Sequence, residues 1–545
     1  MTTTTAPTPA AADDASPAAH RPPHSLWWLL LACAAIAAGV FLFAVTQRLF
    51  YPHEVEWMEG ALADHAARVA DGLPLYAPPS AEHVPFLYAP LLFWLGALGI
   101  HLGLDGIVAL RLIATLSSIA SAMLIGHWVR RDSGRVLPGL VATGMFLAGY
   151  GWLAWWFDLA RNDSLFVMLC LAASYQLRYG TSKRWLWAGL LATTALLAKQ
   201  STLMWLPAVG LGALCLNWRV GIYFGLTSAC TMAIAIGAMH LTSDGWSTFY
   251  LFEMPRHHGW VGQMKLGFWT IDMVTLLPLL VLALLGFAIR VRKDARSALF
   301  LAMFGCGGLL ASWLSRMHVG GFDNVLMYGF SAICILGPIA VARMPRGRLQ
   351  IAGMLLLAGQ FVFLAYRAAE RDPAKTLFAP ESYTMAHEEL RTYVEAQQGP
   401  VWIPAHGHIA YRANKSTGAH GQAMFDLLQV LPKLPNGLFD FSALAAPETR
   451  LDYLSERGRG ALKTMFDSVH ETLRDGRFAA IVIDEIGTGM FPVLFAEGMV
   501  GADRRMGTAD DPYVRREQPL TSQPGATKPL IGFDVRNPYA FERRQ

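Results

Sequence analysis

Long apolar runs separated by short polar stretches dominate the first two-thirds of the chain. The first run covers 26–45, and the later ones cover 86–102, 107–129, 136–155, 164–177, 185–198, 201–216, 220–241, 270–289, 297–314, 325–342 and 349–366. About 20 apolar residues in a helix cross the ~30 Å hydrocarbon core of a bilayer. The pattern therefore predicts a mainly α-helical, polytopic transmembrane bundle.

The run at 86–102 is the doubtful one, because it is short and interrupted by Pro90. The distribution of positive charge decides whether it crosses, since cytoplasmic loops are enriched in Lys and Arg. If it stays at the membrane surface, the basic clusters near 130–135, 178–184, 219, 290–296 and 343–348 all fall on one side. We therefore expect about eleven spans plus juxtamembrane helices, with a cytoplasmic N-terminus and an external C-terminal region.

Composition agrees with a membrane protein. The 545 residues are 54% hydrophobic and 15% charged, against about 25% charged in soluble proteins. A net charge of +4 gives no reason to expect a nucleic-acid partner. All six cysteines lie in apolar runs, which argues against a disulfide framework.

The two ends of the chain differ from the apolar part. Residues 1–25 are rich in Thr, Ala and Pro, which predicts a disordered cytoplasmic N-terminus followed by an uncleaved first span rather than a signal peptide. Residues 368–545 read as a small external α/β domain, with short strands at 401–404 and 480–483 and helices at 383–397 and 461–475. The tail from 508 is rich in Pro and Gly, and we expect it to be irregular.

The first external loop, 48–106, concentrates acids that the rest of the chain lacks: Glu54, Glu56, Glu59, Asp64 and Asp71. Glu56 and Glu59 are three residues apart and would share one side of a helical turn. Partial desolvation at the membrane boundary raises the pKa of a carboxyl, which suits it to accept a proton from a hydroxyl. The alternative is a solvated acidic loop, and the residues do not choose between Glu56 and Glu59.

Further reactive side chains are expected on the same external face. Asp158, Arg161 and Asp163 follow an interfacial Trp pair, and ionisable groups at membrane depth usually face a cavity. The alternative is an ion pair that caps a helix. Four other groups lie in loops of this face, where they could bind an anion or simply form turns: Lys199 and Gln200, Arg256 to His258, His318 with Gly320 and Gly321, and Asn324.

Three motifs resemble a known family. They are the G-x-P-L-Y…Y-A-P run from Gly72 to Pro90, R-N-D-S-L from Arg161 to Leu165, and A-K-Q-S from Ala198 to Ser201. Their order and common side are similar to the GT-C superfamily of integral membrane glycosyltransferases. The likeness is to its family-39-like members, the kin of aminoarabinose transferase and protein O-mannosyltransferases.

The resemblance implies a membrane glycosyltransferase of the bacterial inner membrane. It would move a sugar from a polyprenyl-phosphate donor to a hydroxyl acceptor on a glycolipid, polysaccharide or protein. The family's catalytic acid falls on Glu56, with Glu59 as neighbour, and its second acidic site on Asp158 or Asp163. Some members bind a divalent metal ion, but the motifs assign no ligand here. The residues implied for catalysis are Glu56, Glu59 and Asp163, and those implied for substrate binding are Tyr88, Asp158, Arg161, Lys199, Gln200, Arg256, His257, His318 and Asn324.

Two other classes of function compete. A lipid or sugar transporter, or flippase, should carry ionisable groups deep in several spans and show repeat symmetry. The chain instead gathers its polar groups at one interface and shows no repeat. A non-catalytic assembly subunit would use the external domain only to bind partners.

Overall fold

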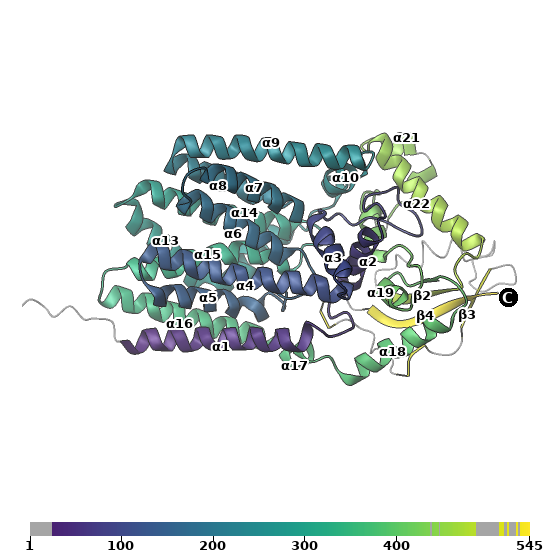
Figure 1. Cartoon of the computed structure of the whole chain (residues 1–545), viewed down its shortest axis with the longest axis horizontal. Coiled ribbons are helices and arrows are strands. Elements are labelled where there is room, and N and C mark those ends of the chain that lie inside the picture. Colours follow the sequence, from purple (N-terminus) through teal and green to yellow (C-terminus); the bar gives the residue numbers. More distant parts are fainter. Residues whose placement is uncertain are drawn as a thin grey trace, which may run out of the picture.

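The computed structural model describes residues 24–435, 439–445, 447–486, 512–516, 520–522, 530–531 and 535–544. The expected disorder of 1–25 therefore lies almost entirely outside the described residues. Within them the chain forms a long helical bundle that carries a smaller α/β region at one end (Figure 1). The fold class expected from the sequence is confirmed.

Eleven helices coincide with the eleven expected spans among the described residues. They are α1 (His24–Arg48), α4 (Gly106–Ser133), α5 (Val136–Trp152), α6 (Asp163–Tyr179), α7 (Arg184–Ala198), α8 (Thr202–Leu216), α9 (Trp218–Thr242), α13 (Leu277–Val291), α14 (Ala295–Met317), α15 (Met327–Arg343) and α16 (Arg348–Ala369). Seven apolar segments are long enough to cross a membrane, if α13 is counted together with the short helical turns before it. The helices α5, α7 and α8 are shorter and also apolar. The protein is an integral membrane protein.

The loop after α1 holds two helices, and the second lies in the run 86–102 that the sequence predicts as a juxtamembrane helix. They are α2 (Glu59–Ala70) and α3 (Leu91–His101). With about 1.5 Å rise per residue, α3 is only about 16 Å long, so it is too short to cross the hydrocarbon. Small residues bring it against its neighbours, since a Cβ on Gly99 would lie 2.7 Å from the Cβ of Ala109 in α4. Figure 1 places α2 and α3 at the end of the bundle that carries the C-terminal region.

Short helical turns fill the other loops at this end. They are α10 (Trp246–Thr248), η1 (Phe249–Glu253), α11 (Met254–His257), α12 (Met264–Gly267), η2 (Phe268–Asp272), η3 (Met273–Leu276) and η4 (Asp323–Leu326). The expected run at 270–289 thus begins as irregular turns. The regular helix α13 starts only at Leu277, where Pro278 occupies its first turn, a position that tolerates proline.

The C-terminal region is built from short helices around a four-stranded sheet. The helices are α17 (Pro373–Leu377), α18 (Glu381–Ala396), α19 (Gly407–Arg412), α20 (Gly421–Leu428), η5 (Phe441–Ala445), α21 (Pro447–Arg450) and α22 (Glu456–Arg474). The strands β1 (Val401–Trp402), β2 (Ala480–Ile486), β3 (Tyr513–Arg515) and β4 (Val535–Arg543) lie in the order β1-β2-β4-β3. β1 and β2 are parallel, with Val401 opposite Ala480, and the other pairs are antiparallel.

The tail expected to be irregular after 508 contributes two of these strands. The antiparallel partner of β2 is β4, with Ile481 opposite Phe541, and the register shifts between Asp484 and Ile486. The high Pro and Gly content of the tail concealed a strand whose pairing depends on β2, more than 50 residues earlier. Parts of the tail lie outside the described residues.

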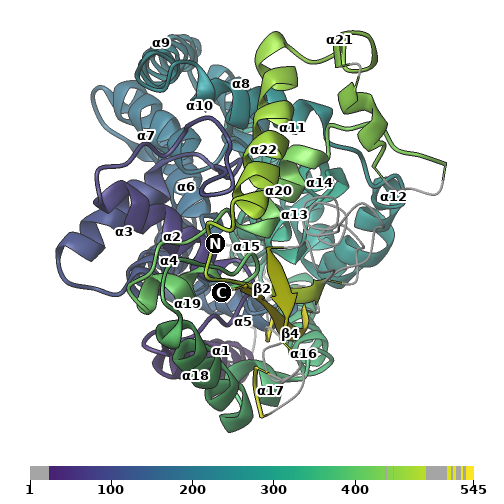
Figure 2. The ribbon, with the colours of Figure 1, turned by 90° about the vertical axis from the view of Figure 1, so that its right-hand side faces the viewer.

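The first loop and the C-terminal region share one hydrophobic core. Met58, Leu62 and Phe86 from the loop pack in the same buried cluster as Met424 and Met465 from α20 and α22. Figure 2 shows these C-terminal helices lying across the end of the bundle. The loop is therefore covered by protein and is not an open acidic surface.

The opposite end of the bundle carries the basic loops. Asp132, at the end of α4, pairs there with Arg178 at 2.6 Å and Arg290 at 2.7 Å, and also with Arg343. The predicted separation of the basic loops from the reactive groups is thus present as two ends of one bundle.

Candidate active site

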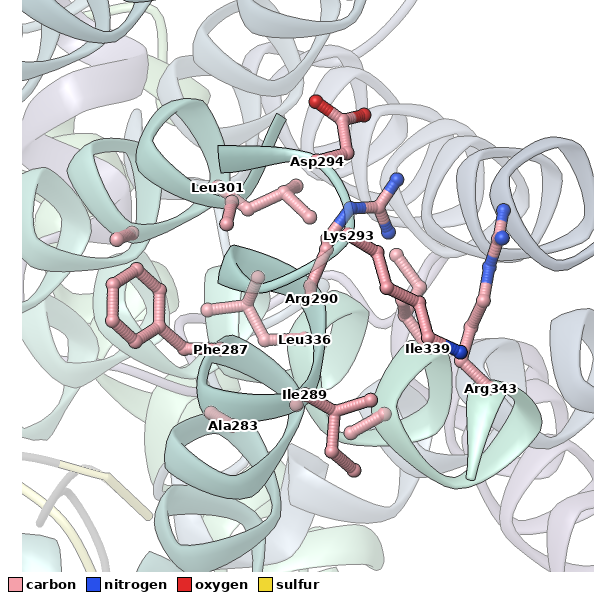
Figure 3. A pocket seen from close by; sticks show the side chains of 14 residues that line it. Ala283, Phe287, Ile289, Arg290, Lys293, Asp294, Leu301, Leu336, Ile339 and Arg343 are labelled. Carbon is pink, nitrogen blue, oxygen red and sulfur yellow. The ribbon is translucent and has the colours of Figure 1, made fainter. Parts of the chain in front are cut away.

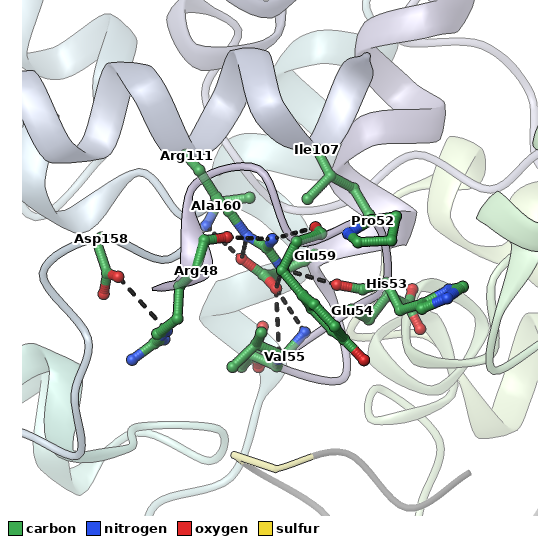
Figure 4. A network of polar contacts seen from close by, with 12 residues as sticks. Arg48, Pro52, His53, Glu54, Val55, Glu59, Ile107, Arg111, Asp158 and Ala160 are labelled. Carbon is green, nitrogen blue, oxygen red and sulfur yellow. Dashed lines mark hydrogen bonds and ion pairs between the residues drawn. The ribbon is translucent and has the colours of Figure 1, made fainter. Parts of the chain in front are cut away.

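Glu59 is held by a complete set of hydrogen bonds (Figure 4). Its carboxylate accepts from the backbone amides of Val55, Glu56 and Ala160, at 2.8, 3.2 and 2.8 Å. The guanidinium of Arg111 donates to both carboxylate oxygens, at 2.9 and 2.5 Å. Glu59 is fully buried at the start of α2, so the pair ties the loop to α4 and α5–α6.

These donors outweigh the burial of Glu59. Burial alone would raise the pKa of its carboxyl, but the Arg111 guanidinium and the backbone amides lower that pKa to about 2. Arg111 also donates to the carbonyls of Arg48, Tyr51 and His53, so it organises the turn between α1 and α2. A carboxylate in this state is ionised but has little capacity to accept another proton.

Glu56 is equally buried but much less saturated. It accepts from Nη1 of Arg161 at 3.2 and 3.3 Å and from the amide of Met58 at 3.2 Å. Burial raises the pKa of its carboxyl to about 7, even though Arg161 pulls that pKa down. Two acids three residues apart therefore have opposite protonation behaviour at neutral pH.

Arg161 joins Glu56 to the aromatic side chains around it. Its Nη2 donates to the hydroxyl of Tyr88 at 2.9 Å, and its guanidinium lies over the rings of Tyr88 and Trp156. Among the described residues its Nε has no hydrogen-bond partner, which leaves a spare donor. The side chain is 8% exposed, so an anion entering the site would meet it early.

Asp163, at the start of α6, is a second hub that collects four donors. One oxygen accepts from Lys199 Nζ at 2.6 Å and the Tyr328 hydroxyl at 2.9 Å, and the other from Asn324 Nδ2 at 2.9 Å and Trp156 Nε1 at 3.2 Å. This brings α6, the α7–α8 turn, η4 and α15 to one point. Lys199 is the most exposed member of the pair, with 14% of its side chain accessible.

Gln200 closes the same region from the neighbouring turn. Its amide donates to the carbonyls of Leu87 at 2.6 Å and Leu251 at 3.3 Å. The R-N-D-S-L and A-K-Q-S motifs therefore converge, together with the Y-A-P part of the first motif through Tyr88. Six of the expected residues form one cluster: Glu56, Tyr88, Arg161, Asp163, Lys199 and Asn324.

Asp158 is placed beside this cluster but faces other partners. It lies 3.4 Å from Arg48 Nε and accepts from the Tyr150 hydroxyl at 2.7 Å, all of it buried. The arrangement joins α1, α5 and the following loop. Within the part of the chain that the structure describes, Asp158 forms no hydrogen bond or ion pair with Glu56 or Asp163, so the structure does not bring it to the same point.

The loop that holds Arg256, His257 and His258 lies beside His318. His318 lies 5.2 Å from His258, ring centre to ring centre, and the ring of His257 lies 5.5 Å from that of Tyr453, tilted by 49°. Arg256 is exposed to solvent. His258 contacts the carbonyl of Asp426 in α20 at 2.9 Å, which connects this loop to the C-terminal region. Within the described residues no group of three or more His, Cys, Asp or Glu side chains is arranged to hold a metal ion.

The C-terminal region contributes charged groups that the sequence did not point to. Asp426 accepts a hydrogen bond from Gln422 at 2.6 Å. Burial raises the pKa of its carboxyl to about 7, although the positive charge of Arg161 lowers it. His406 lies 2.6 Å from Glu54, and His408 lies between Asp64 and Asp105. These pairs join positions more than 300 residues apart, and no local sequence signal marks such partners.

The cluster has side chains suited to acid–base chemistry next to two cationic side chains. It offers a buried carboxyl with a pKa near neutrality, an ionised clamp beside it, and two cations, Arg161 and Lys199, balanced by carboxylates. Buried charges cost free energy unless they are paired, so an arrangement of this density usually serves a ligand or a reaction.

Comparison with known proteins finds solved structures that share the fold of this chain. No protein-family model matches the chain, and no curated protein matches it. Two crystal structures of ArnT from Cupriavidus metallidurans are similar, each with 12% sequence identity and a TM-score of 0.58. The apo structure covers 95% of this chain and 98% of its own, and the one bound to undecaprenyl phosphate covers 94% and 98%. The likeness shows that the chain has the fold of these ArnT structures, which agrees with the fold expected from the motifs.

Proposed function

We propose that the protein is a membrane glycosyltransferase that moves a sugar from a polyprenyl-phosphate donor to a hydroxyl acceptor. The acceptor would be a glycolipid, a polysaccharide or a protein. The proposal rests on the shared fold, the convergence of the three motifs at one cluster, and the chemistry of that cluster. Undecaprenyl phosphate bound to the similar ArnT supports a lipid-phosphate donor for this chain as well.

The difference between Glu56 and Glu59 carries the proposal. Glu59 is saturated by Arg111 and three amides, with a pKa of about 2, so its role is to hold the loop. Glu56 has a pKa of about 7 and a single charged partner, which fits a group that gains and loses a proton near neutral pH. We therefore assign the base to Glu56.

In the proposed reaction, Glu56 accepts the proton of the acceptor hydroxyl. The hydroxyl oxygen forms a bond to the anomeric carbon as the bond from that carbon to the phosphate oxygen breaks. The electron pair of that bond leaves with the polyprenyl phosphate, and the configuration at the anomeric carbon is inverted. The step consumes no oxidant or other co-reactant.

Arg161 and Lys199 would receive the departing phosphate. Arg161 forms an ion pair with Glu56 and Lys199 forms one with Asp163, and their side chains are 8% and 14% exposed. A phosphate that draws Arg161 away from Glu56 would remove the attraction that lowers the pKa of Glu56, and so would strengthen it as a base. Stabilisation of charge in a site of low polarity is worth more than in water.

The remaining expected residues have supporting positions in this proposal. Asp163 orients Lys199 and Asn324, Gln200 fixes the turn that carries Lys199, and Tyr88 positions Arg161. His257, His318 and Arg256 lie at the edge of the site, where they would contact the donor or acceptor. Asp158 would act only through Arg48 and Tyr150. A divalent metal ion is not needed in this scheme.

A transporter or flippase is the second candidate, and the charge distribution disfavours it. The charged side chains of the eleven helices lie within about two turns of the helix ends, and the central parts of these helices are apolar. A path for a charged lipid headgroup through the membrane needs polar groups at mid-depth. The resemblance supports placement at the inner membrane, and the charge bias of the loops supports an external C-terminal region.

The test is transfer by Glu56→Gln. Purified protein is incubated with radiolabelled polyprenyl-phosphate sugar and candidate acceptors, and released polyprenyl phosphate is counted. Loss of one general base lowers a rate about 10²–10⁴-fold, and we expect a loss in this range. The control is Glu82→Gln, an exposed acid of the same loop, which should stay within twofold of wild type.

Two results would contradict the proposal. Near-normal turnover by a folded Glu56→Gln protein would remove Glu56 as the base. Movement of intact donor across vesicle membranes without release of polyprenyl phosphate would favour the transporter instead.

A further inference from the structure

A cavity lies at the end of the bundle opposite the candidate active site. It is formed where α13 and α15 end and α14 begins, and its volume is about 170 Å³ (Figure 3). The polar groups at its edge are Arg290, Lys293, Asp294 and Arg343. None of these belongs to the proposed reaction.

The charges at the polar edge do not cancel. Arg178, Arg290 and Arg343 all pair with the single carboxylate of Asp132, and Lys293 adds a fourth cation nearby. The other acid is Asp294, which caps α14 by accepting from the amide of Ser297. Four cations against two carboxylates leave a charge of +2 at the mouth of the cavity.

The rest of the cavity is apolar. Phe287, Leu301, Leu336 and Ile339 line it, and Figure 3 shows Phe287 on the side away from the basic side chains. From Ala283 to Arg290 the wall of α13 extends about 10 Å along the helix axis. Phe287 is 37% exposed and the adjoining Leu284 is 70% exposed, so this wall faces the surrounding lipid.

We propose that this cavity binds an anionic phospholipid of the bilayer. The phosphate would lie among Arg290, Lys293 and Arg343, and the first acyl carbons would lie against Phe287 and Leu336. Basic pockets between helices near the membrane surface suit such headgroups, because positive charge and apolar surface are both satisfied by one molecule. The site is separate from the donor site, since the two lie at opposite ends of the bundle.

The test measures lipid bound to the purified full-length protein by native mass spectrometry. Phosphatidylglycerol and phosphatidylcholine with identical acyl chains are added to the detergent-solubilised protein, and inorganic phosphate is added in a third arm. We expect phosphatidylglycerol to bind at least tenfold more tightly than phosphatidylcholine, and inorganic phosphate at millimolar concentration not to displace it. Equal binding of the two lipids, or full displacement by phosphate, would overturn the proposal.

Charge variants locate the site. Lys293→Glu should weaken phosphatidylglycerol binding about tenfold, because one attraction is lost and one repulsion is gained. The matched control is Arg292→Glu, which makes the same change at an exposed neighbour outside the cavity lining. Equal losses in both variants would show general surface attraction and would contradict a built site.

A second pair of variants leaves the charges untouched. Ala302→Trp fills the apolar part of the cavity, and Cys306→Trp adds the same bulk at an exposed position of α14 outside it. Only Ala302→Trp should reduce phosphatidylglycerol binding, with both variants eluting as folded protein. Unchanged binding in Ala302→Trp would place the lipid elsewhere.

Discussion

At the scale of single residues, Glu56 and Glu59 illustrate what the sequence could and could not predict. Their spacing and their place after the first apolar run marked both as candidates. Which of them could act as a base depends on Arg111, 52 residues after Glu59 in sequence, and on the backbone amide of Ala160. Those partners have no local signature, so only the folded structure distinguishes the two carboxyls.

The two pKa values predict a distinctive pH dependence of transfer. A base must be deprotonated, and burial raises the pKa of Glu56 to about 7, so kcat/KM for the donor should fall tenfold per pH unit below about 7. Above pH 8, the titration of Glu56 should no longer change kcat/KM. If Glu59 were the base, with its pKa of about 2, the rate would stay constant down to about pH 4.

The measurement is the initial rate at subsaturating donor between pH 5 and pH 8. The control is the residual rate of Glu56→Gln, which should show no such fall. A wild-type profile that is level over this range would contradict the assignment of the base.

At the scale of elements, the sequence predicted the helices of the bundle and missed how the first loop is covered. The apolar pattern and the length of each run identified a span, because a span must be apolar along its whole length. The loop instead holds α2, whose buried face meets α19 from the C-terminal region. Gly60 marks this contact, since a Cβ there would lie 1.9 Å from Glu54 Oε1 and 2.7 Å from the Cβ of His408.

Gly60→Ala should therefore destabilise the cover over the active site. Overpacking of a tight contact costs about 1–3 kcal/mol, and here it also displaces Glu54 from His406. We expect a lower Tm and reduced transfer. The control is Gly225→Ala in α9, where no atom lies within 4 Å of the added Cβ and alanine favours the helix. Equal behaviour of the two variants would show that the α2–α19 contact is not tight.

At the scale of the whole molecule, the candidate active site and the basic loops lie at opposite ends of the bundle. Glu56, Asp163 and Lys199 gather at one end, and Asp132 with its arginines at the other. The distribution of Lys and Arg along the sequence predicted this separation, because loops alternate between the two ends. The joining of the first loop to the C-terminal region in one core was not predicted, since it depends on contacts between segments hundreds of residues apart.

The same distribution predicts which end of the bundle faces the outside of the cell. A cysteine at Glu82, in the first loop, should react with a membrane-impermeant maleimide added to intact cells. A cysteine at Ser182, an exposed residue between α6 and α7, should react only after the cells are opened. The native cysteines lie within apolar helices and provide the background. Labelling of both positions from the same side would contradict the topology.

The position of Glu56 relative to a bound donor tests the proposed reaction most directly. The measurement is a structure of the protein with a non-hydrolysable polyprenyl-phosphonate sugar. The expected result has the phosphonate contacting Arg161 and Lys199, and the Glu56 carboxylate facing the anomeric carbon with room for one acceptor oxygen between them. A sugar bound away from Glu56, or a phosphonate bound at the basic end near Arg290, would contradict it.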